Sequence, residues 1–156
     1  MSFKEILKAF LRELLDALTL TPKKEDEHLH LRNLHLFSFP AELDTILAIS
    51  RRYFPPTEKY PVNPHALILA IREAEKGRKG FEFGVIAVKD TDLKTQCEYA
   101  CATVKKNFER FRESGEKDFI AFLGRRYAPL NVPNDPHNLN RHWVSNVRWF
   151  YERFRG

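Results

Sequence analysis

The stretch Asn63–Gly77, NPHALILAIREAEKG, decides the fold. It opens with asparagine and proline, which is typical of the first turn of a helix, and closes at a glycine, which is typical of a helix C-terminus. Apolar residues recur between them at spacings of three and four, which predicts a helix with one buried face. At about 100° per residue, Glu75 falls on the apolar face and Glu73 on the solvent side.

Glu75 is the residue of this helix that best suits a catalytic role. Burial on an apolar face raises the pKa of a carboxyl group toward the range in which a general acid works. In the alternative interpretation, Glu75 forms an ion pair with Arg72, Arg78 or Lys79 at the helix edge. Helix geometry alone favours the ion pair, because glutamates are common at helix ends.

The rest of the chain has a mainly helical pattern. Spacings of three and four predict further helices over residues 41–53, 90–113, 117–126 and 139–154. Residues 78–90, RKGFEFGVIAVKD, alternate around their phenylalanines and lack the helical period. They predict one short β-hairpin directly after the helix that carries Glu75. The expected fold class is therefore mainly α, a helical lobe with a single hairpin.

The chain divides by composition near residue 60. Residues 1–20 predict an amphipathic helix that begins with the capping pair Ser2 and Glu5, and residues 21–27 are a charged linker. The polar face of this helix mixes both signs of charge, so we expect it to dock on its own domain or on a partner rather than on a membrane. We expect residues 1–60 to be an N-terminal helical extension and residues 61–156 to be the main domain.

The charge and the lack of certain motifs limit the partners. The net charge is +5, and residues 61–156 carry 17 basic and 12 acidic residues. This excess favours a polyanion: nucleic acid, an anionic membrane or a wall polymer. No nucleic-acid-binding motif is present, so nucleic acid ranks last. His28, His30 and His35 have no carboxylate or cysteine at ligand spacing. We therefore predict neither a metal nor a cofactor.

The first residues contain no secretory signal, and no apolar run approaches the roughly 18 residues of a membrane-spanning helix. We therefore expect synthesis in the cytoplasm and no transmembrane segment.

Two runs, Leu69–Gly77 and Glu82–Val85, resemble small phage and bacterial lysozyme-like proteins with an "AIR-x-AE-x-G…EFGV" signature. Later segments resemble the same group: Gln96, Phe119–Pro129, Asn134–Pro136, Leu139-Asn140, Trp143 and Asn146-Val147. The resemblance covers about residues 63–154, in the same order. The enzymatic relatives are goose-type lysozymes, lytic transglycosylases and glucosaminidases. Residues 1–60 lie outside the resemblance.

The resemblance implies a peptidoglycan glycosidase, either a muramidase or a lytic transglycosylase, that cleaves β-1,4 bonds of the cell wall. Glu75 would be the general acid that protonates the leaving oxygen. Tyr127 matches a cleft tyrosine that steadies the positively charged transition state, and a role as a core aromatic is equally compatible. The lack of a signal sequence suits a phage-derived protein that a holin releases or that a virion carries. The alternative is a non-catalytic lysozyme-like structural or wall-binding protein of the virion.

The sequence leaves open which residue supplies the second catalytic carboxylate. Glu82 is the nearest candidate and Asp90 lies further along, but Glu82 could instead hold the hairpin by pairing with Arg78 or Arg126. Without a second carboxylate, the muramic acid group itself can participate and give an anhydro product. Many relatives place a serine directly after the acid, where this chain has Lys76, which puts one helper contact in doubt.

The remaining candidates concern substrate binding. Phe83 and Gly84 would let the hairpin backbone reach the substrate. Asn134 and Asp135 could line a sugar cleft, although residues of these types before a proline more often form turns. Trp143 could stack on a sugar ring, although its helical spacing with Val147 favours the core.

Overall fold

The structure is a computed structural model that describes residues 30–156. The predicted amphipathic helix over residues 1–20 and the linker after it lie outside these residues. Residues 31–156 form one compact unit. That unit therefore begins well before the expected boundary at residue 60, because residues 31–60 pack on the later helices.

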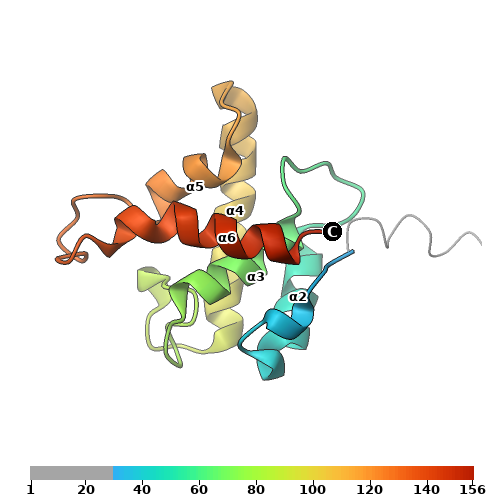
Figure 1. Cartoon of the computed structure of the whole chain (residues 1–156), viewed down its shortest axis with the longest axis horizontal. Helices are drawn as coiled ribbons and strands as arrows, with labels where there is room; N and C mark the ends of the chain where they lie inside the picture. The colour runs from blue at the N-terminus through green and yellow to red at the C-terminus, as the bar shows by residue number, and fades with distance from the viewer. Residues whose placement is uncertain (1–29) are drawn as a thin grey trace, which may run out of the picture. The chain divides into compact units, whose positions relative to one another are not determined.

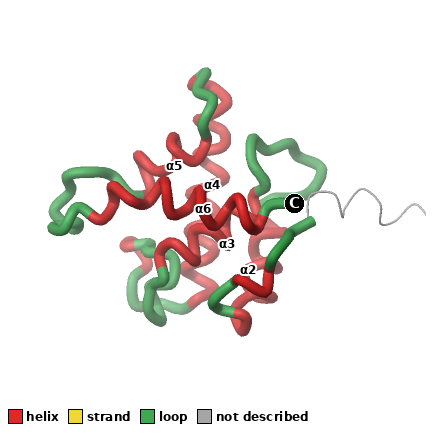
Figure 2. The backbone as a smooth tube through the Cα atoms, viewed as in Figure 1, coloured by secondary structure: helices red, strands yellow, loops and turns green. Residues whose placement is uncertain are grey.

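Helices dominate the described part of the chain, which confirms the mainly α class (Figures 1 and 2). The α-helices are α2 (Leu43–Tyr53), α3 (Pro64–Glu75), α4 (Leu93–Ser114), α5 (Phe119–Tyr127) and α6 (Trp143–Phe154). Four short 3-10 helices accompany them: η1 (Leu34–Leu36), η2 (Pro40–Glu42), η3 (Ile86–Val88) and η4 (Leu139–His142). The predicted helix over residues 139–154 is thus the 3-10 turn η4 followed by α6.

Side-chain caps fix three of the helix starts. The Asn63 side chain accepts hydrogen bonds from the backbone N–H groups at the start of α3, and Pro64 occupies the first turn. Asp92 and Asp118 cap α4 and α5 in the same way. Such caps pair N–H groups that have no partner within the helix. The predicted start of α3 is confirmed.

The central element is α3, and it is buried on every side from Pro64 to Glu73. Helix α6 packs on α3, and the two ribbons cross at the centre of Figure 1. Helix α2 packs on both α3 and α4. Helix α5 joins α4 to α6. Glycine at position 124 permits the approach of α5 to α6, since a Cβ there would meet the side chain of Val144 at 2.5 Å.

Glu73 lies in the interior, so its predicted place on the solvent side is wrong. Residues 37–42 fold across this face of α3, and the Glu73 carboxylate accepts a hydrogen bond from the backbone N–H of Ser38. Its neighbour Arg72 is 2% exposed and pairs with Glu42, through Nε at 2.6 Å and Nη2 at 3.0 Å. Arg72 also lies over the ring of Phe39, 3.6 Å from its centroid.

The predicted β-hairpin is wrong, because the described residues contain no strand and residues 76–92 form turns and η3 (Figure 2). The side chain of Gln96 explains the difference. Its Oε1 accepts from the N–H groups of Phe83 and Val85, and its Nε2 donates to the carbonyls of Val85 and Val88. One amide thus satisfies the backbone groups that a second strand would otherwise pair.

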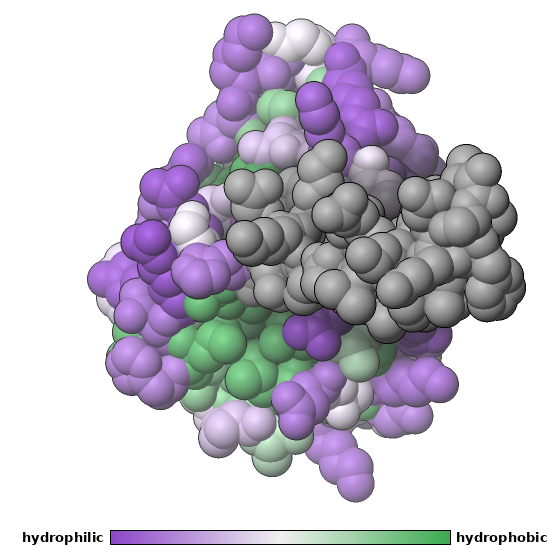
Figure 3. Space-filling view, turned by 90° about the vertical axis from the view of Figure 1, so that its right-hand side faces the viewer, coloured by the Kyte–Doolittle hydropathy of each residue, from purple (hydrophilic) through white to green (hydrophobic). Residues whose placement is uncertain are grey.

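On the face drawn in Figure 3, the described residues place hydrophilic side chains beside a smaller hydrophobic area. No helix among residues 30–156 is long and apolar enough to cross a membrane.

Candidate active site

Glu75 is the last residue of α3, and the chain turns sharply after it. Lys76 adopts a left-handed conformation with φ 45°, and its N–H closes the helix on the carbonyl of Arg72. Left-handed backbone stops a helix because the following residues leave its axis. The Glu75 side chain therefore lies where the end of α3 meets the loop over residues 77–90.

The carboxyl of Glu75 is desolvated and bonded to an indole. Trp143, the first residue of α6, donates from Nε1 to Oε1 of Glu75 at 2.7 Å. Burial raises the pKa of Glu75 from 4.5 to about 7, and the hydrogen bond from Trp143 opposes the rise. A carboxyl with this pKa is available as an acid near neutral pH.

The alternative interpretation of Glu75, an ion pair at the helix edge, does not match the structure. Arg72 pairs with Glu42, and Arg78 pairs with Asp90 at 2.6 Å. Among residues 30–156, no basic side chain is within ion-pair distance of Glu75, and burial is the leading cause of its raised pKa.

Gly84 gives the carboxyl its space. This glycine has a φ of +67°, and a Cβ built on it would lie 2.7 Å from Cδ of Glu75 and closer still to Oε2. Any larger residue would therefore displace the acid or the loop. Because glycine adopts positive φ without strain, the loop can bring its backbone against the carboxyl.

Tyr127, at the end of α5, supports the indole. The two rings stack with centroids 5.1 Å apart and planes 25° apart. The Tyr127 hydroxyl donates to the carbonyl of Phe83 at 2.7 Å. Burial, followed by the charge of Glu75, raises the pKa of Tyr127 well above its usual 10, so the phenol is neutral. Tyr127 packs against the core and also lines the pocket described next.

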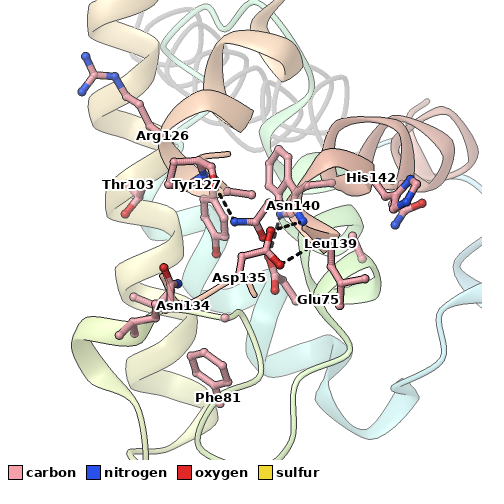
Figure 4. A pocket seen from close by; sticks show the side chains of 18 residues that line it. Glu75, Phe81, Thr103, Arg126, Tyr127, Asn134, Asp135, Leu139, Asn140 and His142 are labelled. Carbon is pink, nitrogen blue, oxygen red and sulfur yellow. Dashed lines mark hydrogen bonds between the residues drawn. The ribbon is translucent and has the colours of Figure 1, made fainter. Parts of the chain in front are cut away.

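A pocket of about 800 Å³ opens beside Glu75. The predicted residues that line it are Glu75, Gly84, Tyr127, Asn134, Asp135 and Trp143. They come from α3, the loop over residues 77–90, α5, the loop over residues 128–138, and α6. In Figure 4, Glu75, Asp135 and Asn140 lie at the centre of the pocket, whereas the guanidinium of Arg126 extends away from them.

Asp135 has a structural task as well as a place in the pocket. Its two carboxylate oxygens accept from the N–H groups of Leu139 and Asn140, each at 2.8 Å. The Asn140 side chain in turn donates to the carbonyl of Pro129 at 2.8 Å. These bonds, dashed in Figure 4, hold the loop closed on itself. Asp135 therefore forms the turn and also lines the pocket, and Asn134 beside it is exposed on the pocket wall.

Glu82 and Phe83 are predicted site residues that the structure does not bring to the pocket. Glu82 is 4% exposed, its Oε1 accepts from the N–H of Gly80, and its Oε2 has no hydrogen-bond partner among residues 30–156. It pairs with neither Arg78 nor Arg126. The ring of Phe83 is fully buried, and only its carbonyl bonds to a pocket residue, Tyr127. Asp90, the more distant candidate, lies on the surface in its pair with Arg78.

Trp143 is a core residue, as its helical spacing predicted, and it has a polar contact that the sequence did not predict. It is 6% exposed and belongs to the core, yet its N–H contacts the acid. Stacking of a sugar on the ring has little room, because Tyr127 covers the indole.

Sequence reasoning missed several pocket residues. They are Thr103, Arg126, Asn140, His142 and Asn146, together with the apolar Phe81, Ile86 and Leu139. Asn140 and Asn146 belong to segments that carry the lysozyme-like resemblance, and this was the available signal. Thr103 carries no signal in the sequence, because only the packing of α4 brings it to the pocket.

The described residues contain no group of three or more histidine, cysteine, aspartate or glutamate side chains that could hold a metal ion. No family model, curated protein sequence or solved structure matches the chain.

Proposed function

We propose that this protein is a peptidoglycan glycosidase, a muramidase or a lytic transglycosylase, with Glu75 as the general acid. The observation that carries the proposal is the desolvated carboxyl of Glu75 at the wall of an open pocket. A carboxyl that keeps its proton near pH 7 is what glycosidic bond cleavage requires of its acid.

In the proposed reaction, Glu75 gives its proton to the glycosidic oxygen while the C–O bond breaks. The bonding pair stays on that oxygen, so the anomeric carbon becomes positive and Glu75 becomes a carboxylate. Water or a hydroxyl of the muramic acid residue then attacks the carbon. The proton that this nucleophile releases returns to Glu75. The two nucleophiles give a reducing end and an anhydro end, respectively.

Asp135 is the second carboxylate of the proposed site, in place of Glu82. It lines the same pocket as Glu75, and two backbone N–H groups hold both of its oxygens. A carboxylate held in this way suits electrostatic stabilisation of a positive anomeric carbon better than covalent attack on it. This arrangement favours the anhydro route over a covalent glycosyl-enzyme.

The composition supports an anionic wall as the partner. Residues 61–156 carry the whole net charge of +5, and a basic surface attracts an anionic polymer. The proposed setting is a phage-derived protein that reaches the wall after holin-type release or as part of a virion.

The decisive experiment is wall clearing by the variant Glu75→Gln, which keeps the size of the side chain and removes the acidic proton. We expect the rate to fall about a thousandfold, as for loss of a general acid. Glu82→Gln is the matched control, because this buried glutamate lies outside the pocket, and it should clear at nearly the wild-type rate. Unchanged clearing by Glu75→Gln would remove the proposed acid.

Mass spectrometry of the digested wall separates the possible reactions. Anhydro ends identify a transglycosylase, reducing muramic acid ends a muramidase, and reducing glucosamine ends a glucosaminidase. If the wild-type protein releases none of these, a non-catalytic wall-binding or virion role becomes the better proposal.

A further inference from the structure

The bond between Trp143 and Glu75 makes the two carboxyl oxygens different. An indole N–H can donate a hydrogen bond but cannot accept one. Oε1 of Glu75 is therefore always the acceptor, at 2.7 Å from Nε1. In a protonated carboxyl, the oxygen that accepts is the carbonyl oxygen and the other one carries the hydrogen. Here the other oxygen is Oε2, which lies against the pocket-lining Gly84.

We propose that Trp143 is a positioning residue that keeps the acidic proton of Glu75 on Oε2, beside Gly84 and the pocket. The use of that proton in glycan cleavage rests on the proposed function, whereas its location rests on the contacts alone.

The indole is held firmly enough for this task. Trp143 is 6% exposed, and one face of its ring stacks on Tyr127. The hydroxyl of Tyr127 is fixed in turn by the carbonyl of Phe83, the residue before Gly84. The two sides of the Glu75 carboxyl, the indole and the loop backbone, are thus connected through one phenol.

The same bond becomes stronger as the reaction proceeds. A hydrogen bond to a carboxylate is shorter and stronger than one to a neutral carboxyl. Trp143 therefore stabilises Glu75 most after the proton has left, when negative charge is present on the acid. This is stabilisation of developing charge by a donor that is already in place.

Other ionisable side chains at the pocket have to be separated from Glu75 in any test. They are Arg126, Tyr127, Asp135 and His142. None of them is among the causes of the raised pKa of Glu75. His142 directly precedes Trp143 and lines the same pocket, so it needs a control.

The indole N–H itself is the probe that tests the proposal without any enzyme assay. The chain has two tryptophans, so the nitrogen–proton NMR spectrum has two indole signals, and Trp149 is 52% exposed and serves as the internal reference. We expect the Trp143 signal to shift with pH around a midpoint near 7. Glu75→Gln should abolish the shift and His142→Gln should leave it. A Trp143 signal that does not titrate, or that still titrates in Glu75→Gln, overturns the proposal.

Trp143→Phe tests the positioning role in the reaction. Loss of a donor that favours the carboxylate should raise the pKa of Glu75 further, as followed by the carbon NMR signal of its carboxyl. Clearing should slow about tenfold at unchanged KM, and the alkaline fall in rate should move to higher pH. Trp149→Phe is the matched control and should change none of these. A pKa of Glu75 that stays or falls in Trp143→Phe contradicts the role.

The two proposals fail separately. A wild-type protein that clears no wall while its Trp143 signal titrates with Glu75 removes the glycosidase function and leaves the proton assignment. Clearing that depends on Glu75, with a Trp143 signal that ignores it, removes only the role of Trp143.

Discussion

Glu73 and Glu75 stand two residues apart on α3, and their surroundings are opposite. Around Glu73 the chain supplies complementary groups: the N–H of Ser38 for the glutamate, and Glu42 with the ring of Phe39 for the adjacent Arg72. Around Glu75 it supplies one indole N–H, a glycine and a pocket. Each carboxyl has one hydrogen-bond donor, and Oε2 of Glu73 has no hydrogen-bond partner among residues 30–156. The difference is that the chain encloses Glu73, whereas Glu75 lies beside an open pocket and is available for chemistry.

The largest loss of stability should come from removing the bonds of Arg72. Arg72→Met keeps the aliphatic length but removes four bonds: two to Glu42 and one each to the carbonyls of Gly77 and Glu82. We expect the free energy of unfolding to fall by about 3 kcal/mol, as for a buried ion pair that loses one partner. Urea unfolding followed by circular dichroism measures it.

Arg52→Met is the control, since Arg52 forms a surface pair with Glu98 and is 60% exposed. Its loss should cost less than about 1 kcal/mol. An equal fall in the free energy of unfolding for the two variants would show that the contacts of Arg72 with residues 37–42 do not stabilise the fold.

A second effect is the contribution of Glu75 to the pH dependence of stability. The pKa of Glu75 is about 7 in the folded protein and near 4.5 in the unfolded chain. Between these values, only the folded state keeps the proton. The contribution of Glu75 to stability is therefore complete below pH 4.5 and is lost as the pH rises through 7, by roughly 3 kcal/mol in all.

Urea unfolding at several pH values tests this sign. Glu75→Gln should lack that part of the fall in stability between pH 5 and 7.5, and Glu73→Gln should retain it. A wild-type stability that rises through this window relative to Glu75→Gln would contradict a desolvated acid.

The smallest effect concerns the space left for the acid. Gly84→Ala places a methyl group against the Glu75 carboxyl in left-handed backbone, whereas Gly115→Ala has similar backbone, φ +73°, and no heavy atom within 4 Å. Gly115→Ala should cost about 1 kcal/mol of unfolding free energy for the backbone alone, and Gly84→Ala about 1 kcal/mol more. Only Gly84→Ala should slow wall clearing. Equal costs, with clearing unchanged, would mean that the loop moves aside freely.

Local signals were sufficient for the helices. Asn63-Pro64 and Asp92 are caps whose partners lie within four residues, so the sequence carries them in full. The position of Glu75 on the apolar side of α3 follows from the same periodicity. For this reason the mainly α class and the place of Glu75 on the apolar side of α3 could be predicted.

The two wrong predictions, an exposed Glu73 and a β-hairpin, share a physical cause. Each depends on a contact with residues that are distant in the sequence. Glu73 is covered by residues about 35 positions earlier, and a helical wheel cannot include them. The alternation in residues 81–85 is real, but Gln96 pairs the backbone that a strand would have paired. Because the segment is a loop and not a hairpin, the Glu82 carboxylate accepts a hydrogen bond from the N–H of Gly80 and does not line the pocket.

The single amide of Gln96 also bears on how freely this region could vary. A hairpin must preserve its register, since a shift of one residue turns every side chain to the opposite face. A loop held by separate side-chain bonds, from Gln96, Tyr127 and Arg72, has no such register to preserve. The wall beside Glu75 is fixed at residues 83–88, and Asp90 ties the end of the loop to Gly80 and Arg78. The exposed side chain of Ile86, which lines the pocket, could therefore vary while Gly84 stays against the acid. Variation in substrate could in this way arise next to an unchanged acid.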